Sequence, residues 1–289
     1  MKGSREQTLE DQRQARLDGL WPRHRPAVMA VLNRTPDSFS DGGSYLDAGA
    51  AVAHGELLIA EGADIIDIGG ESTRPEADPV TTDEQLRRVL PVLVQLRSRH
   101  PETLLSVDTS DLDVAEAALD AGADLINDVT AASRPGLLEL VASRRAAIVL
   151  MHMRGTPRTM QTDTDYDDVV AEVRSFLTRR ARAAVDSGIP PHRVWLDPGI
   201  GFGKDEMGNL RLLAALPELA GLGHPVLVGA SRKSFIGRLT GTSVEARLPG
   251  SLAALIPVIG LARAVARVHD AAASVQFLEV AARLHEVAS

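Results

Sequence analysis

The chain has 289 residues, with 31 basic and 39 acidic side chains and a formal net charge of -8. This length suits one large domain or two modest ones with a sizeable core, and the negative balance argues against nucleic acid or an acidic membrane surface as a partner. The absence of cysteine excludes disulfides, a thiolate nucleophile and Cys-ligated zinc.

The first 25 residues form a polar leader. They are rich in charged side chains and lack the apolar stretch of a signal peptide, and no later segment is apolar for long enough to cross a bilayer. We therefore expect a cytoplasmic protein. Residues 1–25 would be a flexible or weakly helical extension, and residues 26–289 would form one domain.

Eight short runs rich in Val, Ile and Leu follow, each bounded by glycine or polar residues. They are Ala27 to Leu32, Ile65 to Ile68, Leu104 to Val107, Leu125 to Ile126, Ile148 to Met151, Val194 to Leu196, Val226 to Val228 and Val265 to Val268. Because apolar and polar residues do not alternate in them, they are typical of parallel strands covered on both faces. Helical patterns follow the runs, for example at Asp47 to Ala60, Thr82 to Arg97 and Asp167 to Val185.

Eight strand–helix units predict an α/β protein with a single (β/α)8 TIM barrel. The alternative is an open doubly wound sheet, which is less favoured because no GxGxxG motif follows the first run. No linker divides the chain. Within the helical pattern from Ser251 to Ala264, Pro257 would cost about 3 kcal/mol unless a helix kinks or begins there.

Polar or charged residues follow every predicted strand. They are Asn33, Gly69 to Pro75, Asp108, Asn127, His152, Asp197 to Lys204, Ser231 to Lys233 and Arg267 to Asp270. In a barrel these residues converge on the carboxyl face, where catalytic groups lie. Each also has a structural explanation on its own: Asp108 as a helix cap, Asn127 as a turn residue, and Ser231 to Lys233 as a solvated basic turn. Their convergence favours a binding site.

Eight motifs, in this order, resemble the dihydropteroate synthase family. They are NRTPDSFSDGG (Asn33 to Gly43), GGESTRP (Gly69 to Pro75), SVDT (Ser106 to Thr109), INDV (Ile126 to Val129), LMHM (Leu150 to Met153), LDPGIGFGK (Leu196 to Lys204), SRKS (Ser231 to Ser234) and RVHD (Arg267 to Asp270). The resemblance runs from about residue 27 to the last predicted helix. It implies a TIM barrel that joins 6-hydroxymethyl-7,8-dihydropterin diphosphate to 4-aminobenzoate in folate synthesis. It also implies release of diphosphate, use of Mg²⁺, a homodimer and inhibition by sulfonamides.

Carried over position by position, the resemblance implies a role for each matching residue. The pterin would be held by Asp108, Asn127, Met151, Asp197, Phe202, Lys233 and Arg267. The diphosphate would be held by Asn33, Thr73, Arg74, Arg267 and His269, with Asn33 as the magnesium ligand. The 4-aminobenzoate site would be bordered by Thr73, Arg74, Pro75, Lys233 and Ser234. Catalysis would involve Asn33, Arg267 and His269, together with Phe39 and Asp41 of a mobile first loop.

The chemistry of these residue types suits a pterin. A carboxylate such as Asp197 can accept two N–H bonds from the ring edge, and the Asn127 amide can serve mixed donor and acceptor positions. Lys233 can only donate, and the planar guanidinium of Arg267 can stack on the ring. Magnesium, Arg267 and His269 would stabilise the diphosphate as its charge develops, and no protein nucleophile is required.

Several positions depart from the pattern of the family. Arg34, Glu76 and Asp78 add charges to two loops beside the expected diphosphate, and Arg263 and Pro257 alter the region that would form the dimer contact. These differences leave open a non-catalytic pterin-binding paralogue. A pterin-binding methyltransferase of corrinoid metabolism is a further alternative, but it would not need the SRK and RVHD motifs for a diphosphate.

Overall fold

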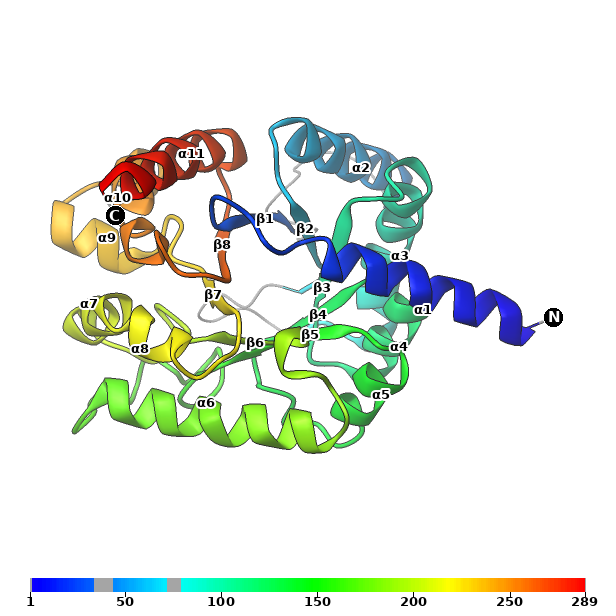
Figure 1. Cartoon of the computed structure of the whole chain (residues 1–289), viewed down its shortest axis with the longest axis horizontal. Coiled ribbons are helices and arrows are strands. Elements are labelled where there is room, and N and C mark those ends of the chain that lie inside the picture. The colour runs from blue at the N-terminus through cyan, green and yellow to red at the C-terminus, as the bar shows by residue number, and fades with distance from the viewer. Residues whose placement is uncertain (1, 34–43, 72–78, 289) are drawn as a thin grey trace.

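In the computed structural model, which describes residues 2–33, 44–71 and 79–288, eight parallel strands close into a barrel in chain order (Figure 1). The strands are β1 (Ala27–Asn33), β2 (Ile65–Gly69), β3 (Leu104–Asp108), β4 (Leu125–Asp128), β5 (Ala147–Met151), β6 (Val194–Asp197), β7 (Val226–Val228) and β8 (Ala264–Val268). Because β1 pairs with both β2 and β8, the sheet has no edge. The predicted TIM barrel is confirmed, and the open doubly wound alternative is wrong.

Helices surround the barrel. They are α2 (Ser44–Ala60), α3 (Thr82–Arg99), α4 (Leu112–Asp120), α5 (Leu137–Ser143), α6 (Val169–Asp186), α7 (Glu206–Ala214), α8 (Leu216–Ala220), α9 (Ser234–Thr240), α10 (Leu248–Ala253) and α11 (Ala271–Ala288). Short 3₁₀ helices occur at η2 (Pro191–Arg193), η3 (Val244–Ala246) and η4 (Ile256–Val258). Within the described ranges, no helix combines the length and the apolar character that crossing a membrane requires.

The two faces of each strand contribute to two separate apolar clusters. Outward residues such as Val28 and Ile66 pack against the surrounding helices. Inward residues such as Met29, Ile65 and Trp195 fill the amino-terminal part of the barrel interior. Because side chains alternate along a strand, both faces must be apolar where both are covered. The interior becomes polar only toward the carboxyl ends of the strands, where the candidate site lies.

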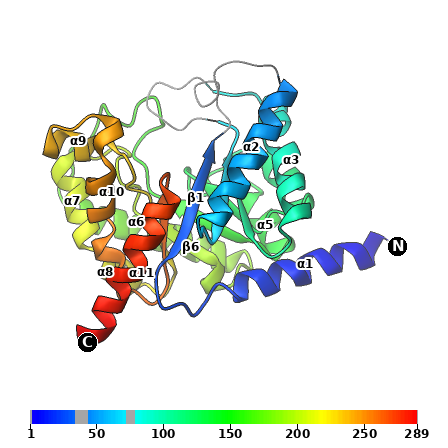
Figure 2. The ribbon, with the colours of Figure 1, turned by 90° about the horizontal axis from the view of Figure 1, so that it is seen from above.

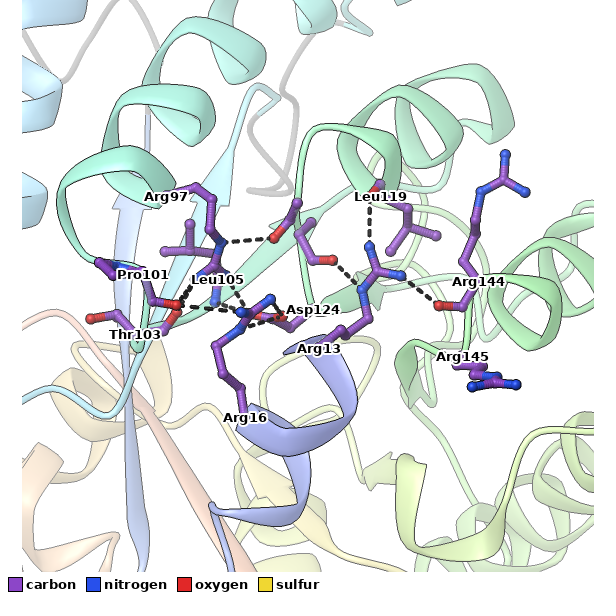
Figure 3. A network of polar contacts seen from close by, with 12 residues as sticks. Arg13, Arg16, Arg97, Pro101, Thr103, Leu105, Leu119, Asp124, Arg144 and Arg145 are labelled. Atoms are coloured by element: carbon purple, nitrogen blue, oxygen red, sulfur yellow. Dashed lines mark hydrogen bonds and ion pairs between the residues drawn. The ribbon is translucent and has the colours of Figure 1, made fainter. Parts of the chain in front are cut away.

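The polar leader forms a helix, α1 (Lys2–Asp18), which lies across the amino-terminal end of the barrel (Figures 2 and 3). Arg13 is only 2% exposed and donates hydrogen bonds to the carbonyl oxygens of Leu119, Ala123 and Arg144. Two of these carbonyls belong to the carboxyl ends of α4 and α5, where the helix dipole favours a cation. The leader is thus helical from Lys2 to Asp18 and contacts the barrel through Arg13.

A buried carboxylate, Asp124, ties α1 to the barrel. Arg16 Nη2 lies 2.8 Å from Asp124 Oδ1, and Arg97 of α3 pairs with the other carboxylate oxygen (Figure 3). Asp124 also accepts the backbone N–H of Leu105 at 2.9 Å. The carboxylate is fully buried, so these charged donors are needed to compensate its lost hydration.

Pro257 does not interrupt a helix. The predicted helical pattern from Ser251 to Ala264 divides into the end of α10, the 3₁₀ helix η4 and a turn that leads into β8. Pro257 lies at the start of η4, where its missing N–H has no helical partner to lose. The expected cost of about 3 kcal/mol is therefore avoided because a helix begins there.

Candidate active site

The register of the strands brings polar residues into one row at the carboxyl end of the barrel. Asn33 is aligned with Gly69, Gly69 with Asp108, and Asp108 with Asn127. Gly69 leaves space for its neighbour, because a Cβ atom there would lie 2.8 Å from Asn33 Oδ1. Asn33, Asp108 and Asn127, three residues expected at the site, therefore lie in one row on β1, β3 and β4, with Gly69 of β2 between the first two.

Arg267 of β8 reaches two carboxylates. Its Nε and Nη2 atoms each lie 2.7 Å from Asp67 Oδ2, and Nη2 lies 2.8 Å from Asp108 Oδ2. Asp67 is fully buried and Asp108 is nearly so, whereas the Arg267 side chain remains 20% exposed. Burial opposes the charge, but the two carboxylates outweigh it and raise the pKa of Arg267 above its ordinary value. The guanidinium is therefore a permanent cation at the site.

Asp108, an expected site residue, does not cap a helix. The cap of α4 is Asp111, whose Oδ1 accepts the backbone N–H of Asp113 at 3.0 Å. Burial raises the pKa of Asp108 to about 7, and the nearby Asp67 adds to this rise while Arg267 opposes it. A carboxyl group with such a pKa can exchange its proton near neutral pH.

Asn127 lies inside β4 and is not a turn residue. Its Nδ2 atom donates to Asp67 Oδ2 at 3.0 Å, so Asn127 and Arg267 share one carboxylate oxygen. Asp67 was not among the predicted site residues. The signal in the sequence was a carboxylate in the middle of the apolar run IIDIG, a position that is costly unless the group is paired.

Asp197 ends β6 beside Met151 of β5, with which it is aligned. Its Oδ1 accepts the backbone N–H of Gly199 at 2.7 Å. Gly199 has a φ of 68°, and a Cβ atom at this position would overlap the carbonyl oxygen of His152, so the loop requires glycine. Burial raises the pKa of Asp197, and the nearby Lys233 cation opposes the rise.

Lys233 lies over the ring of Phe202, with Nζ 4.3 Å from the ring centroid. The ammonium also donates to the carbonyl oxygen of Ile200. Burial lowers the pKa of Lys233 to about 8, although Asp197 favours the charged form. Met151 is buried and is aligned with Asp197, and Phe202 is partly buried within the loop that Asp197 begins. Both side chains are thus suitably placed to line a flat ligand.

Behind this loop lies a buried lysine, Lys204, that was not among the predicted site residues. Its Nζ atom is 3.0 Å from His152 Nδ1, 3.0 Å from the His152 carbonyl oxygen and 2.8 Å from the Phe202 carbonyl oxygen. Burial lowers the pKa of Lys204 well below its ordinary value, while Asp197 opposes this. The lysine fastens the glycine-rich loop to the end of β5.

The loops after β7 and β8 are fastened to each other. Ser231 Oγ accepts the backbone N–H of His269 at 3.2 Å and lies 3.1 Å from His269 Nδ1. Arg232 pairs with Asp270, and its Nε lies 2.9 Å from Asp270 Oδ2. The solvated-turn explanation fits Arg232, which is 43% exposed, but not Ser231, which is buried. Ser234 is exposed as the first residue of α9.

Five of the predicted site residues lie outside the described part of the chain. They are Phe39, Asp41, Thr73, Arg74 and Pro75, and the unusual residues Arg34, Glu76 and Asp78 also lie outside it. The described ranges bring together Asn33, Asp108, Asn127, Met151, Asp197, Phe202, Lys233, Arg267 and His269 at the carboxyl end of the barrel.

Comparison with known proteins shows which family this chain resembles. Residues 29–269 match the pterin binding enzyme family. The dihydropteroate synthase of Synechocystis sp. is 44% identical over 259 residues, which are 89% of each chain. In Yersinia pestis, the dihydropteroate synthase solved as a sulfonamide drug complex is 41% identical, with a TM-score of 0.84 and coverage of 91% and 95% of the two chains.

The dihydropteroate synthase of Xanthomonas albilineans is similarly close. Its structure with 4-aminobenzoic acid is 50% identical, with a TM-score of 0.84 and coverage of 90% of this chain and 93% of the other. Its structure with 7,8-dihydropteroate is 47% identical, with a TM-score of 0.81 and coverage of 90% and 94%. The chain therefore belongs to the pterin binding enzyme family, among the dihydropteroate synthases.

Proposed function

We propose that this chain is a dihydropteroate synthase, which joins 6-hydroxymethyl-7,8-dihydropterin diphosphate to 4-aminobenzoate and forms 7,8-dihydropteroate and diphosphate in folate synthesis. The observation that carries the proposal is the group of buried acceptors and cations at one end of the barrel, with Arg267 bridging from β8 to Asp108 on β3. Relatives solved with 4-aminobenzoic acid and with 7,8-dihydropteroate support the same reaction.

The pterin would bind among the carboxylates and the amide. Asp108 and Asp197 supply acceptors for ring N–H groups, and the Asn127 side chain supplies an amide. Lys233 donates to a ring oxygen or nitrogen, and Phe202 and Met151 cover the apolar faces of the ring. Arg267 stacks on the ring through the flat face of its guanidinium. When these carboxylates are ionised, each N–H bond that they accept is charge-assisted, and their burial excludes competing water.

In the chemical step, the bond between the pterin methylene carbon and the diphosphate oxygen breaks, and the electron pair remains on the diphosphate. The lone pair of the 4-aminobenzoate amine forms the new C–N bond, and the amine then loses a proton to the solvent or the released diphosphate. Arg267 and His269 would stabilise the leaving group, assisted by Asn33 and by Thr73 and Arg74 from outside the described ranges. Phe39 and Asp41 would act beside the methylene carbon.

The residues present fit a magnesium ion that arrives with the diphosphate. The amide oxygen of Asn33 is a suitable ligand, since Mg²⁺ binds through few protein oxygens and keeps waters and phosphate oxygens. Among the described residues no group of three His, Asp or Glu side chains forms a dedicated metal cage. Bound there, Mg²⁺ would neutralise charge on the leaving group.

The 4-aminobenzoate would lie beside Lys233 and Ser234, with Thr73, Arg74 and Pro75 at its border. A sulfonamide resembles this substrate, and the sulfonamide drug complex of the Yersinia pestis relative supports binding of a sulfonamide to this chain. A homodimer and a cytoplasmic location remain predictions from the sequence. Exposed apolar side chains on α11 at Val280, Leu284 and Val287 are compatible with a homodimer.

The test is to mix the purified chain with both substrates and Mg²⁺ and to measure 7,8-dihydropteroate by chromatography. We expect product that depends on all three components and is reduced by a sulfonamide. A chain that binds pterin but forms no product would be the non-catalytic paralogue. Removal of the extra charges by Glu76→Gly with Asp78→Ala would then show whether those two acids are responsible for the lack of product.

A further inference from the structure

Asp67 occupies an unusual position for a carboxylate, in the middle of β2 with no exposed surface. It lies two residues before Gly69, which belongs to the row at the end of the strands, so its side chain points into the barrel below that row. Asp67 is therefore beneath the candidate pterin site and acts on a ligand only through other residues.

Three nitrogen atoms from two distant strands lie close to one oxygen of Asp67. Arg267 donates through Nε at 2.7 Å and places Nη2 in ion-pair contact at 2.7 Å, and Asn127 donates through Nδ2 at 3.0 Å. The donors lie 200 and 60 residues from Asp67 along the chain. The other oxygen, Oδ1, has no hydrogen-bond partner in the described ranges. Asp67 is thus the common acceptor for two residues expected to hold the pterin.

This contact fixes which way the Asn127 amide faces. A carboxylate only accepts hydrogen bonds, so the NH₂ end of the amide must point toward Asp67. The amide oxygen is then turned away from Asp67, and the opposite orientation would set two oxygens against each other. Asn127 consequently offers an acceptor to its remaining surroundings.

The same carboxylate holds the guanidinium of Arg267 by one edge. Nε and Nη2 are engaged by Asp67, and Nη2 is also bound to Asp108. Among the residues that the structure describes, none forms a hydrogen bond or an ion pair with Arg267 Nη1. A guanidinium held by one edge keeps its plane fixed, which leaves its other edge and its flat faces for a ligand.

We propose that Asp67 is the positioning residue that sets the donor and acceptor pattern of the pterin site by orienting Asn127 and Arg267. The inference rests on the proposed function, because it identifies Asn127 and Arg267 as pterin contacts. It adds a residue that never touches the ligand and that determines which edge of a heterocycle is accepted.

The direct test is Asp67→Asn, with Ser106→Ala as the matched control. Ser106 is also fully buried, points into the barrel and is aligned with Asp67, but its hydroxyl has no partner in the described ranges. With 6-hydroxymethylpterin as the calorimetric probe, we expect at least a tenfold loss of affinity for Asp67→Asn and less than a twofold change for Ser106→Ala. The KM for 4-aminobenzoate at saturating pterin diphosphate should change less than twofold.

A pH profile separates positioning from a merely structural role. Burial is the main cause of the raised pKa of Asp108, and Arg267 opposes it. The negative charge of Asp67, with those of Asp128 and Glu71, raises this pKa further. Asp67→Asn should therefore move the pH midpoint of pterin binding to lower pH. A lower melting temperature alone, with unchanged affinity and midpoint, would overturn the proposal.

Two further measurements keep the proposal testable if the single variant does not fold. In the wild-type chain, the Asn127 side-chain N–H signals should exchange slowly with solvent by NMR, and fast exchange would overturn the proposal. The pair Asp67→Asn with Asn127→Asp exchanges donor and acceptor, and it should bind the probe at least fivefold more tightly than Asn127→Asp alone. Wild-type chain that binds the probe without forming product would contradict the proposed function but not this inference.

Discussion

Lys204 and His152 form a buried pair, with Nζ 3.0 Å from Nδ1 and the lysine only 1% exposed. Two carbonyl oxygens, those of His152 and Phe202, complete three contacts around the lysine nitrogen. Three acceptors match the three N–H bonds of an ammonium group, which favours a charged lysine despite its burial. The pair is the internal support of the loop that carries Asp197 and Phe202.

From this pair we predict the proton state of His152. Burial, with the nearby Lys204 charge, lowers the pKa of His152 to about 3, so the ring should stay neutral at pH 5 and above. If Lys204 donates to Nδ1, the proton of the ring lies on Nε2. Nitrogen-15 NMR, assigned with a His152→Gln variant, should show the Nε2–H tautomer, and the Nδ1–H tautomer would mean that Lys204 is neutral.

The second prediction concerns Asp197. In Asp197→Asn the amide oxygen can keep the bond to the Gly199 N–H, but an NH₂ group then faces the N–H donors of the pterin. Loss of a charged bond and an unpaired donor should cost at least about 3 kcal/mol, or roughly 100-fold in affinity.

Calorimetry with a pterin checks this value. The control is Asp205→Asn in the same loop, which removes one charge but preserves an N-cap residue of α7. Equal losses in both variants would assign the effect to charge alone and not to the hydrogen-bond pattern.

The third prediction is a pH dependence of stability. Because burial raises the pKa of Asp108 to about 7 from 3.8, its contribution to stability is complete below pH 3.8 and is lost as the pH rises to about 7. The lost contribution is on the order of a few kcal/mol.

Asp108→Asn should remove this part of the pH dependence. Urea unfolding at pH 4, 5, 6 and 7 measures it, with the exposed Asp113→Asn as a control that keeps the wild-type slope. A wild-type slope in Asp108→Asn would show that another group is responsible.

The fourth prediction concerns the leader helix. Arg13→Met removes a charged donor from the carbonyl oxygens of Leu119, Ala123 and Arg144, so we expect a loss of about 2–4 kcal/mol in the free energy of unfolding. Arg182→Met is the matched control, since the Arg182 side chain is 84% exposed, and it should change stability by less than about 0.5 kcal/mol. Denaturant unfolding of both variants tests the difference. Similar values would mean that α1 contributes little to the barrel.

The strands could be predicted because burial on both faces produces an unbroken apolar run in the sequence. The run Val194 to Leu196, for example, differs from β6 (Val194–Asp197) by one residue. Parallel strands covered by helices need apolar side chains in unbroken order, so neighbouring residues carry the information. The residues at the strand ends could be named for the same reason, since Asp108, Asn127 and Asp197 directly follow or end such runs.

Contacts between distant parts of the chain could not be predicted from such local patterns. The sequence determined that residues 26–289 contain eight strand–helix units and that particular polar residues end the strands. Only the closed barrel decided that Asp67 receives Arg267 from 200 residues away, and that Arg13 of a highly charged leader is buried against carbonyl oxygens more than 100 residues along the chain. Local patterns record whether a position is buried, whereas the partner of a buried charge depends on strand register and closure, which every strand fixes together.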